Sequence, residues 1–165
     1  MVTAVHLKYF ATICLALLIL QACQSLSERA PESYIASYHD YPPKIEQFQV
    51  CHDVGCENRT LVSLKRADWE KLKGYFQPAA ISAKAEREQI RNAVALFEET
   101  VGPLAKTQND MSRNQSGPRW TDRQLDCVAE TINTTTYLLL FQQQGWLRWH
   151  TVGFPQHRGL FDLLG

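Results

Sequence analysis

The sequence predicts an α+β fold in which an N-terminal β-hairpin is followed by two to three helices and a C-terminal strand. Apolar and polar residues alternate over Glu46–Cys51 and Arg59–Leu64, and the intervening turn contains Gly55, which is the pattern of a hairpin. Farther along the chain, apolar residues recur at helical spacing over Ala83–Val101 and Cys127–Gln144. Strand-like runs followed by helix-like runs are typical of the α+β class.

The two long helices are bounded by residues that cap or break helices. Ser82 and Asp126 each precede a helical run, and their side-chain oxygens can accept hydrogen bonds from the first unpaired helix amides. Gly102 followed by Pro103 is expected to end the first helix, and Gly145 the second.

Three further segments complete the expected domain. Asp68–Phe76 places its apolar residues on one helical face, so a short helix is expected there. Leu104–Thr121 is polar and rich in helix-breaking residues, which indicates a surface loop. Leu147–Val152 alternates between apolar and polar residues and is expected to form the last strand, ended by Gly153 and Pro155.

Length and charge limit the class of protein. A chain of 165 residues with 45 % hydrophobic and 21 % charged residues has the composition of one globular domain. Its 17 basic and 17 acidic residues balance, and no cluster of Lys and Arg could follow a phosphate backbone. Nucleic acid is therefore not expected as a partner, and no motif predicts a cofactor.

The amino end differs in composition from the rest of the chain. Met1–Leu20 contains no acidic residue, and Lys8 precedes an apolar run from Tyr9 to Leu20. As a helix this run would reach about 18 Å, well short of the ~30 Å hydrocarbon core of a bilayer. We therefore interpret residues 1–22 as a secretion signal, residues 23–45 as a tether and residues 46–165 as a single small domain.

The residues that follow the apolar run are Leu20-Gln21-Ala22-Cys23, and they resemble the lipobox of bacterial lipoproteins. The resemblance implies cleavage after Ala22, alkylation of the Cys23 thiol by diacylglycerol and acylation of the new amine. Several acyl chains hold a protein on a membrane far more firmly than one. Because residue 24 is Gln, we expect a lipid anchor in the outer membrane, facing the periplasm. An ordinary secreted protein or an uncleaved apolar tail is the alternative.

Cys51 and Cys56 flank a tight turn between the two expected strands, where their Cα atoms could approach to the distance that a disulfide needs. The compartment beyond the inner membrane is oxidising, so a disulfide is expected. A metal site that includes His52 is the alternative. Zinc needs four ligands, however, and no second pair has the right spacing, so no metal site is predicted.

Cys127 is the candidate nucleophile. It directly follows the expected cap Asp126, where unpaired amides and the helix dipole favour a thiolate. The alternative is that Cys127 packs as a small buried hydrophobe. His150, in the expected last strand, and His157, in a loop flanked by Pro and Gly, are the candidate proton carriers.

Four segments carry a further resemblance: V-C-H-D-V-G-C, L-K-R-A-D-W, L-D-C-V-A-E-T-I-N-T-T-T-Y-L and G-W-L-R-W-H. From about Val50 onward the chain resembles an uncharacterised proteobacterial family of small exported proteins. The layout is similar to papain-like and transglutaminase-like cysteine enzymes, in which a Cys attacks a carbonyl and a His carries the proton. Ala129 stands where the family has an acidic residue. The family's later W-x-H and V-D-S-W segments are absent, so we expect an incomplete core from a truncated reading frame.

Two functions are consistent with these observations. The first is a membrane-anchored periplasmic lipoprotein with a binding or structural role, whose partner is the lipid bilayer through acylated Cys23. The alternative is a cysteine hydrolase or acyltransferase of transglutaminase-like type, with Cys127 as its nucleophile.

Overall fold

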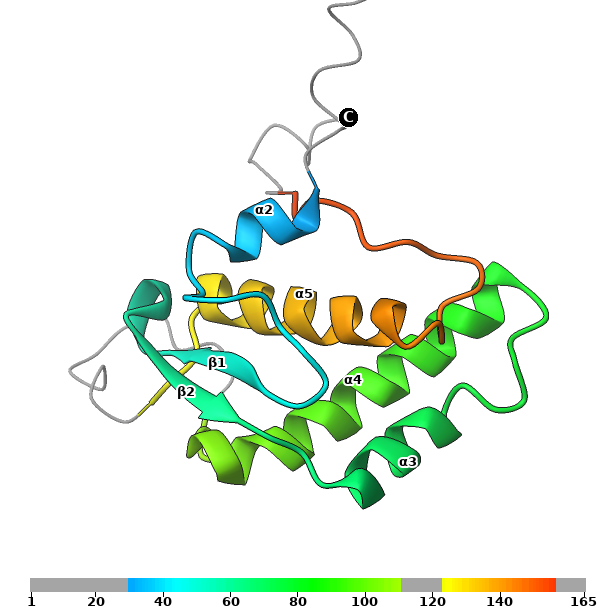
Figure 1. Ribbon diagram of the computed structural model, residues 1–165, viewed down its shortest axis with the longest axis horizontal. Helices are drawn as coiled ribbons and strands as arrows, with labels where there is room; N and C mark the ends of the chain where they lie inside the picture. The colour runs from blue at the N-terminus through cyan, green and yellow to red at the C-terminus, as the bar shows by residue number, and fades with distance from the viewer. Residues whose placement is uncertain (1–29, 111–122, 157–165) are drawn as a thin grey trace, which may run out of the picture. The chain divides into compact units, whose positions relative to one another are not determined.

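The computed structural model describes residues 30–110 and 123–156. Within these residues the fold is α+β, as predicted: a two-stranded antiparallel sheet packs with helices (Figure 1). The strand β1 and the short 3-10 helix η1 contact α5, β2 contacts α4, α3 packs on α4, and α2 packs on α5. In chain order the elements are α2 (Pro31–Ile35), β1 (Phe48–His52), η1 (Val54–Cys56), β2 (Asn58–Val62), α3 (Arg66–Gly74), α4 (Ala83–Ala105) and α5 (Cys127–Gln143).

The predicted hairpin is confirmed, with its strands shifted by one or two residues. In its register Phe48 lies opposite Val62 and His52 opposite Asn58. All five residues of β1 are buried, because the strand lies between two apolar clusters. Phe48 and Val50 belong to the larger cluster, while Cys51 belongs to the smaller one.

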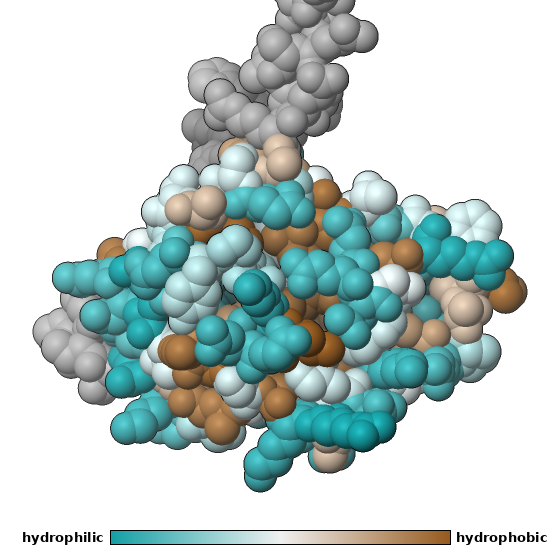
Figure 2. All heavy atoms as spheres, viewed as in Figure 1, coloured by the Kyte–Doolittle hydropathy of each residue, from teal (hydrophilic) through white to brown (hydrophobic). Residues whose placement is uncertain are grey.

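The larger cluster is an aromatic core between the hairpin and α3, α4 and α5. Phe97 of α4 stacks on Tyr137 of α5, with ring centroids 4.1 Å apart and planes 21° from parallel. Phe48 from β1 lies 5.4 Å from Phe97, which ties the sheet to the helices. Figure 2 shows that hydrophobic residues also reach the viewed surface, in patches between hydrophilic ones. The core residues that share this burial are Phe48, Val50, Val62, Trp69, Leu72, Phe76, Ala93, Phe97, Val101, Ala105, Tyr137, Leu140 and Phe141.

Both predicted N-caps are confirmed. Ser82 accepts a hydrogen bond from the Ala85 amide at 3.2 Å, and Asp126 accepts one from the Ala129 amide at 2.8 Å. The second carboxylate oxygen of Asp126 accepts from the Gly55 amide at 2.7 Å. Asp126 therefore both begins α5 and ties it to the turn of the hairpin.

The prediction that Gly102 and Pro103 end α4 is wrong, because α4 continues to Ala105. Proline removes one intrahelical hydrogen bond, which the last turn of a helix can tolerate. The helix ends instead at Lys106, which adopts the left-handed conformation (φ 61°). The amides of Lys106 and Thr107 both donate to the Gly102 carbonyl, so the end of the helix is paired.

Residues 31–45, which the sequence analysis placed in the tether, are packed against the domain. Ile35 of α2 is 2 % exposed and belongs to the smaller core cluster with Ile132 and Leu139 of α5. Arg59 of β2 also donates to the Tyr38 carbonyl at 2.8 Å. The tether expected over residues 23–45 is therefore wrong for residues 31–45, which belong to the domain.

The C-terminal strand expected over Leu147–Val152 does not form; this segment is irregular. Its amides are paired with a side chain rather than with a strand. The amides of Arg148, Trp149 and His150 donate to the buried Glu86 carboxylate of α4 at 2.6–2.8 Å. A carboxylate that collects three successive amides leaves none of them available to pair with the hairpin.

None of the helices in residues 30–110 and 123–156 is both long and apolar enough to cross a bilayer. The predicted signal, its cleavage residue Ala22, the lipidation residue Cys23 and the loop residues 111–122 lie outside the described residues.

Candidate functional site

A cleft of about 630 Å³ lies between the C-terminal half of α4 and the N-terminal half of α5. The turn over residues 107–110 closes one side of it. Its volume falls in the range of about 300–1,000 Å³ that small-molecule sites occupy. Its walls mix carboxylates with apolar side chains, and the residues used below are Glu98, Glu99, Val101, Asp110, Leu125, Glu130 and Tyr137.

Tyr137 lines this cleft as an almost completely buried side chain, 2 % exposed. Its ring stacks on Phe97, which fixes its orientation. No described residue forms a hydrogen bond with the Tyr137 hydroxyl, which keeps access to the cleft; the fully buried side-chain atom that lacks a partner among these residues is His39 Nδ1. Burial, and to a lesser extent the nearby Glu98 carboxylate, raises the pKa of Tyr137, so the phenol is neutral.

The carboxylates of the cleft repel one another. Desolvation in the cleft, followed by the charges of Glu130 and Asp110, raises the pKa of Glu98. Desolvation, followed by Asp110 and Asp126, raises the pKa of Glu130. None of the ion pairs among the described residues involves Glu98, Glu99, Glu130 or Asp110. The cleft is therefore a region of uncompensated negative charge in a chain of zero net charge.

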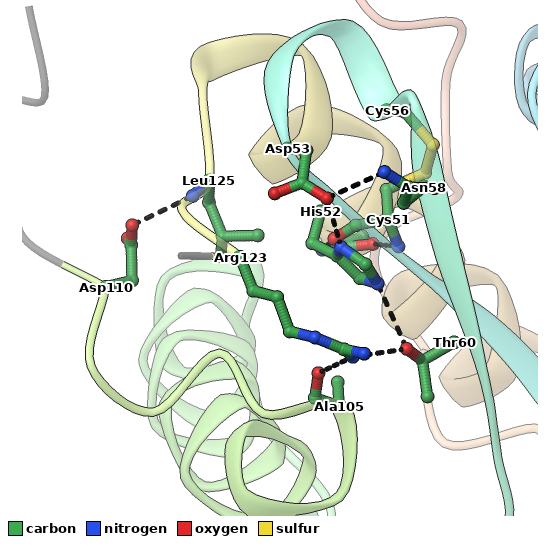
Figure 3. A network of polar contacts seen from close by, with 11 residues as sticks. Cys51, His52, Asp53, Cys56, Asn58, Thr60, Ala105, Asp110, Arg123 and Leu125 are labelled. Atoms are coloured by element: carbon green, nitrogen blue, oxygen red, sulfur yellow. Dashed lines mark hydrogen bonds and ion pairs between the residues drawn. A yellow bond between two sulfur atoms is a disulfide. The ribbon is translucent and has the colours of Figure 1, made fainter. Parts of the chain in front are cut away.

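A polar network holds the walls of the cleft in place (Figure 3). Arg123, just before α5, donates from Nη1 to the Ala105 carbonyl at 2.8 Å and to Thr60 Oγ1 at 3.0 Å. The Leu125 amide donates to Asp110 Oδ1 at 2.8 Å. These contacts join the end of α4, strand β2 and the start of α5.

Gly102 lets the turn approach α4 closely. A Cβ at this position would lie 3.3 Å from the Cα of Gln108 and 3.5 Å from its Cβ and its amide nitrogen. The neighbour is backbone, which cannot move aside as the end of a side chain can. The narrow edge of the cleft thus depends on a glycine at residue 102.

The same network contains an Asp-His-Thr series. His52 Nδ1 lies 2.8 Å from Asp53 Oδ2, and His52 Nε2 lies 3.0 Å from Thr60 Oγ1 (Figure 3). One tautomer satisfies every group: His52 donates to Asp53 and accepts from Thr60, whose oxygen accepts from Arg123. His52 is only 4 % exposed and Thr60 does not line the α4–α5 cleft, so this series positions the hairpin.

Asn133 of α5 is a structural residue that the sequence analysis missed. It is 3 % exposed; its Oδ1 accepts from the Cys51 amide at 2.7 Å and its Nδ2 donates to the Cys51 carbonyl at 2.9 Å. The side-chain amide therefore pairs with β1 as a neighbouring strand would. An asparagine inside an apolar helix is the only sequence signal for this contact, because asparagine is unfavourable there.

The predicted disulfide between Cys51 and Cys56 is present, with Cα atoms 4.8 Å apart (Figure 3). Both sulfurs are consumed by this bond, so neither can bind a metal as a thiolate. Within residues 30–110 and 123–156, no group of three or more His, Cys, Asp or Glu side chains could hold a metal ion.

Cys127 and His150 are not brought together. Cys127 is the first residue of α5 and is an exposed free thiol. His150 Nδ1 instead lies 2.7 Å from Glu86 Oε2. Two residues after His150, the Val152 amide donates to the side chain of Gln142 near the end of α5. At 1.5 Å per residue, Gln142 lies about 22 Å along the helix from Cys127. His157, the other candidate proton carrier, lies outside the described residues.

Comparisons with known proteins add no relative: no protein-family model matches the chain, and no curated protein or solved structure is significantly similar to it.

Proposed function

We propose that this protein is a membrane-anchored lipoprotein of the bacterial envelope that binds a ligand in the α4–α5 cleft. The observation that carries the binding role is Tyr137, a 2 % exposed side chain that lines the cleft and whose hydroxyl none of the described residues binds. A ligand that hydrogen bonds to this hydroxyl would supply the partner that the described residues do not. The uncompensated charge of Glu98 and Glu130 beside it would also be neutralised.

The anchor is supported by the sequence Leu20-Gln21-Ala22-Cys23 and by the short distance along the chain from Cys23 to α2. Only residues 24–30 separate Cys23 from Pro31, and at about 3.5 Å per residue they could extend no farther than roughly 25 Å. A domain acylated at Cys23 would therefore stay near the leaflet. We place it on the outer membrane, on its periplasmic side, because residue 24 is Gln.

The cysteine-enzyme alternative needs a proton carrier beside Cys127. His150 is held by Glu86 instead, and no observation on the described residues favours that function.

Metabolic labelling with an alkyne fatty acid tests the anchor. The wild-type chain should take up the label and fractionate with membranes, whereas Cys23→Ser should be unlabelled. The matched control is Cys127→Ser, which removes the free thiol of α5 and should leave labelling unchanged. An unlabelled wild-type chain in the soluble fraction would contradict the anchor and leave the cleft to be judged separately.

A further inference from the structure

We propose that the ligand of the α4–α5 cleft is a small organic cation that carries a protonated primary amine. This inference rests on the proposed binding role and names its ligand class. It follows from three features of the described residues at the cleft: carboxylates without a counter-charge, a Tyr137 hydroxyl that none of these residues binds, and apolar walls between them.

The carboxylates surround the cleft from every element that forms it. Glu98 and Glu99 come from α4, Asp110 from the following turn, and Glu130 from α5. Among the described residues no Lys, Arg or His forms an ion pair with any of them. A cation in the cleft would be attracted by several carboxylates at once, and because Glu98, Glu99 and Glu130 are exposed, water and salt weaken each attraction.

The neutral Tyr137 phenol suits an ammonium group. An ammonium has three donors and no acceptor, so it needs oxygen acceptors in several directions. The Tyr137 oxygen has free lone pairs at the base of the cleft, and the neighbouring Glu98 and Glu130 carboxylates accept without donating. An anion would find no cationic donor among these groups.

The apolar walls favour an organic cation over a metal ion. The carboxylates are too dispersed to form a group of three metal ligands within the described residues. Val101, Leu125 and the Tyr137 ring lie between them and can cover methylene groups. A volume of about 630 Å³ accommodates an alkylamine or one lysine side chain, which would present a charged end and an apolar stem.

Calorimetric titration of the full chain in a non-ionic detergent tests the proposal, with 1,4-diaminobutane as the probe at pH 7 and low salt. Wild type should bind, and Glu130→Gln should weaken binding about fivefold to tenfold through the loss of one attractive charge. Tyr137→Phe should weaken it by a similar factor while leaving Tm unchanged, because none of the residues 30–110 and 123–156 forms a hydrogen bond with this hydroxyl. Glu70→Gln, the same charge change on α3, is the matched control and should bind as wild type does.

Binding should also depend on salt and pH. Raising NaCl to 0.5 M should weaken it, because exposed charges are screened. Lowering the pH from 7 to 4.5 should weaken it too. The titratable groups that line the cleft are Glu98 and Glu99, Asp110, Glu130 and the neutral Tyr137. The pKa values of Glu98 and Glu130 are raised by desolvation and by neighbouring carboxylates, so these two groups lose their charge at a higher pH than an ordinary glutamate does.

Further titrations separate the sources of the cation. Binding of N-acetyl-Gly-Lys-Gly-amide in place of the diamine would support the same cation class, with a peptide lysine as its source. Tighter binding of Mg²⁺ that does not depend on Tyr137 would overturn the proposal. Diamine binding that appears only after Arg113 and Arg119 are both replaced by Gln would overturn it as well, because the chain would then supply its own cation.

Native mass spectrometry of the protein taken from membranes distinguishes failure of the ligand class from failure of the binding role. An uncharged or anionic molecule that Tyr137→Phe releases would overturn the cation and keep a binding cleft. A wild-type cleft with no bound molecule and no response to the diamine would overturn both.

Discussion

Replacing Asn133 with Ala should destabilise the domain strongly, because its side chain pairs with the backbone of β1. The substitution removes two hydrogen bonds and leaves the Cys51 amide and carbonyl buried without partners, since Cys51 is 0 % exposed. Each bond contributes about 1 kcal/mol net, and each orphaned buried group costs about 1–3 kcal/mol. The free energy of unfolding should fall by about 3–4 kcal/mol, a large fraction of the ~5–15 kcal/mol of a typical domain.

The assay is urea and thermal unfolding followed by circular dichroism under oxidising conditions. For a domain of this size, ~3–4 kcal/mol corresponds to a fall in Tm of about 10 °C. The control is Asn92→Ala, an exposed position of α4, which should leave stability unchanged or slightly raised because Ala favours helices. A loss below about 1 kcal/mol for Asn133→Ala would refute the idea that its side chain substitutes for a neighbouring strand.

A second variant tests the direction of the two bonds. Asn133→Asp keeps an acceptor for the Cys51 amide but turns a carboxylate oxygen toward the Cys51 carbonyl. At pH 7 this repulsion should destabilise the domain at least as much as Asn133→Ala does. Near pH 4 a protonated carboxyl can donate to the carbonyl, so stability should partly recover. A variant whose stability relative to wild type is the same at both pH values would contradict this contact geometry.

Three further predictions concern other contacts. Burial alone would raise the pKa of Glu86, but hydrogen bonds from the amides of residues 148–150 and from the His150 side chain outweigh it and lower that pKa. The Glu86 carboxylate therefore stabilises the folded domain above about pH 4.5, and this contribution is lost in acid. Glu86→Gln should therefore reduce Tm at pH 7 and flatten its decline in acid; an unchanged pH profile would count against this clamp. Glu130→Gln should raise Tm at pH 7 by relieving repulsion and should leave Tm unchanged near pH 4. A lower Tm of the variant at both pH values would disprove the repulsion. Replacing Cys51 and Cys56 together by Ser should cost about 2 kcal/mol relative to oxidised wild type, near the low end because the loop is short. Urea unfolding measures this cost, and reduced wild type is the control that should unfold as the variant does.

Local features of the fold could be predicted because their causes lie within a few residues of one another. The hairpin follows from alternation and a glycine turn, and the starts of α4 and α5 follow from Ser82 and Asp126, whose oxygens reach the next turn. The disulfide belongs to the same group, since Cys51 and Cys56 are separated by a single turn. Even the helical Thr run acts locally, because Thr135 and Thr136 donate to carbonyls four residues earlier, as their residue type predicts.

Whether Cys127 and His150 form a catalytic pair could not be predicted from residues that are close together in the sequence. Cys127 opens a helix, as its position predicted, but the location of a partner histidine depends on how the chain returns after α5. His150 returns to Glu86 of α4, which attracts it with a buried carboxylate. Alternation over residues 147–152 predicted a strand, and the prediction failed because a period-two pattern does not show which group will accept hydrogen bonds from the amides.

By itself, then, the sequence determined the class of fold, the capped helix starts, the disulfide and the resemblance of residues 20–23 to a lipobox. Only the tertiary structure decided that Asn133 pairs with a strand 82 residues away, that residues 31–45 join the domain, and that Glu98 and Glu130 share a cleft with Tyr137, whose hydroxyl no described residue binds. The physical reason is the range of the interactions. Caps and turns act within one or two turns of chain, whereas burial, desolvation and charge repulsion depend on which distant surfaces meet.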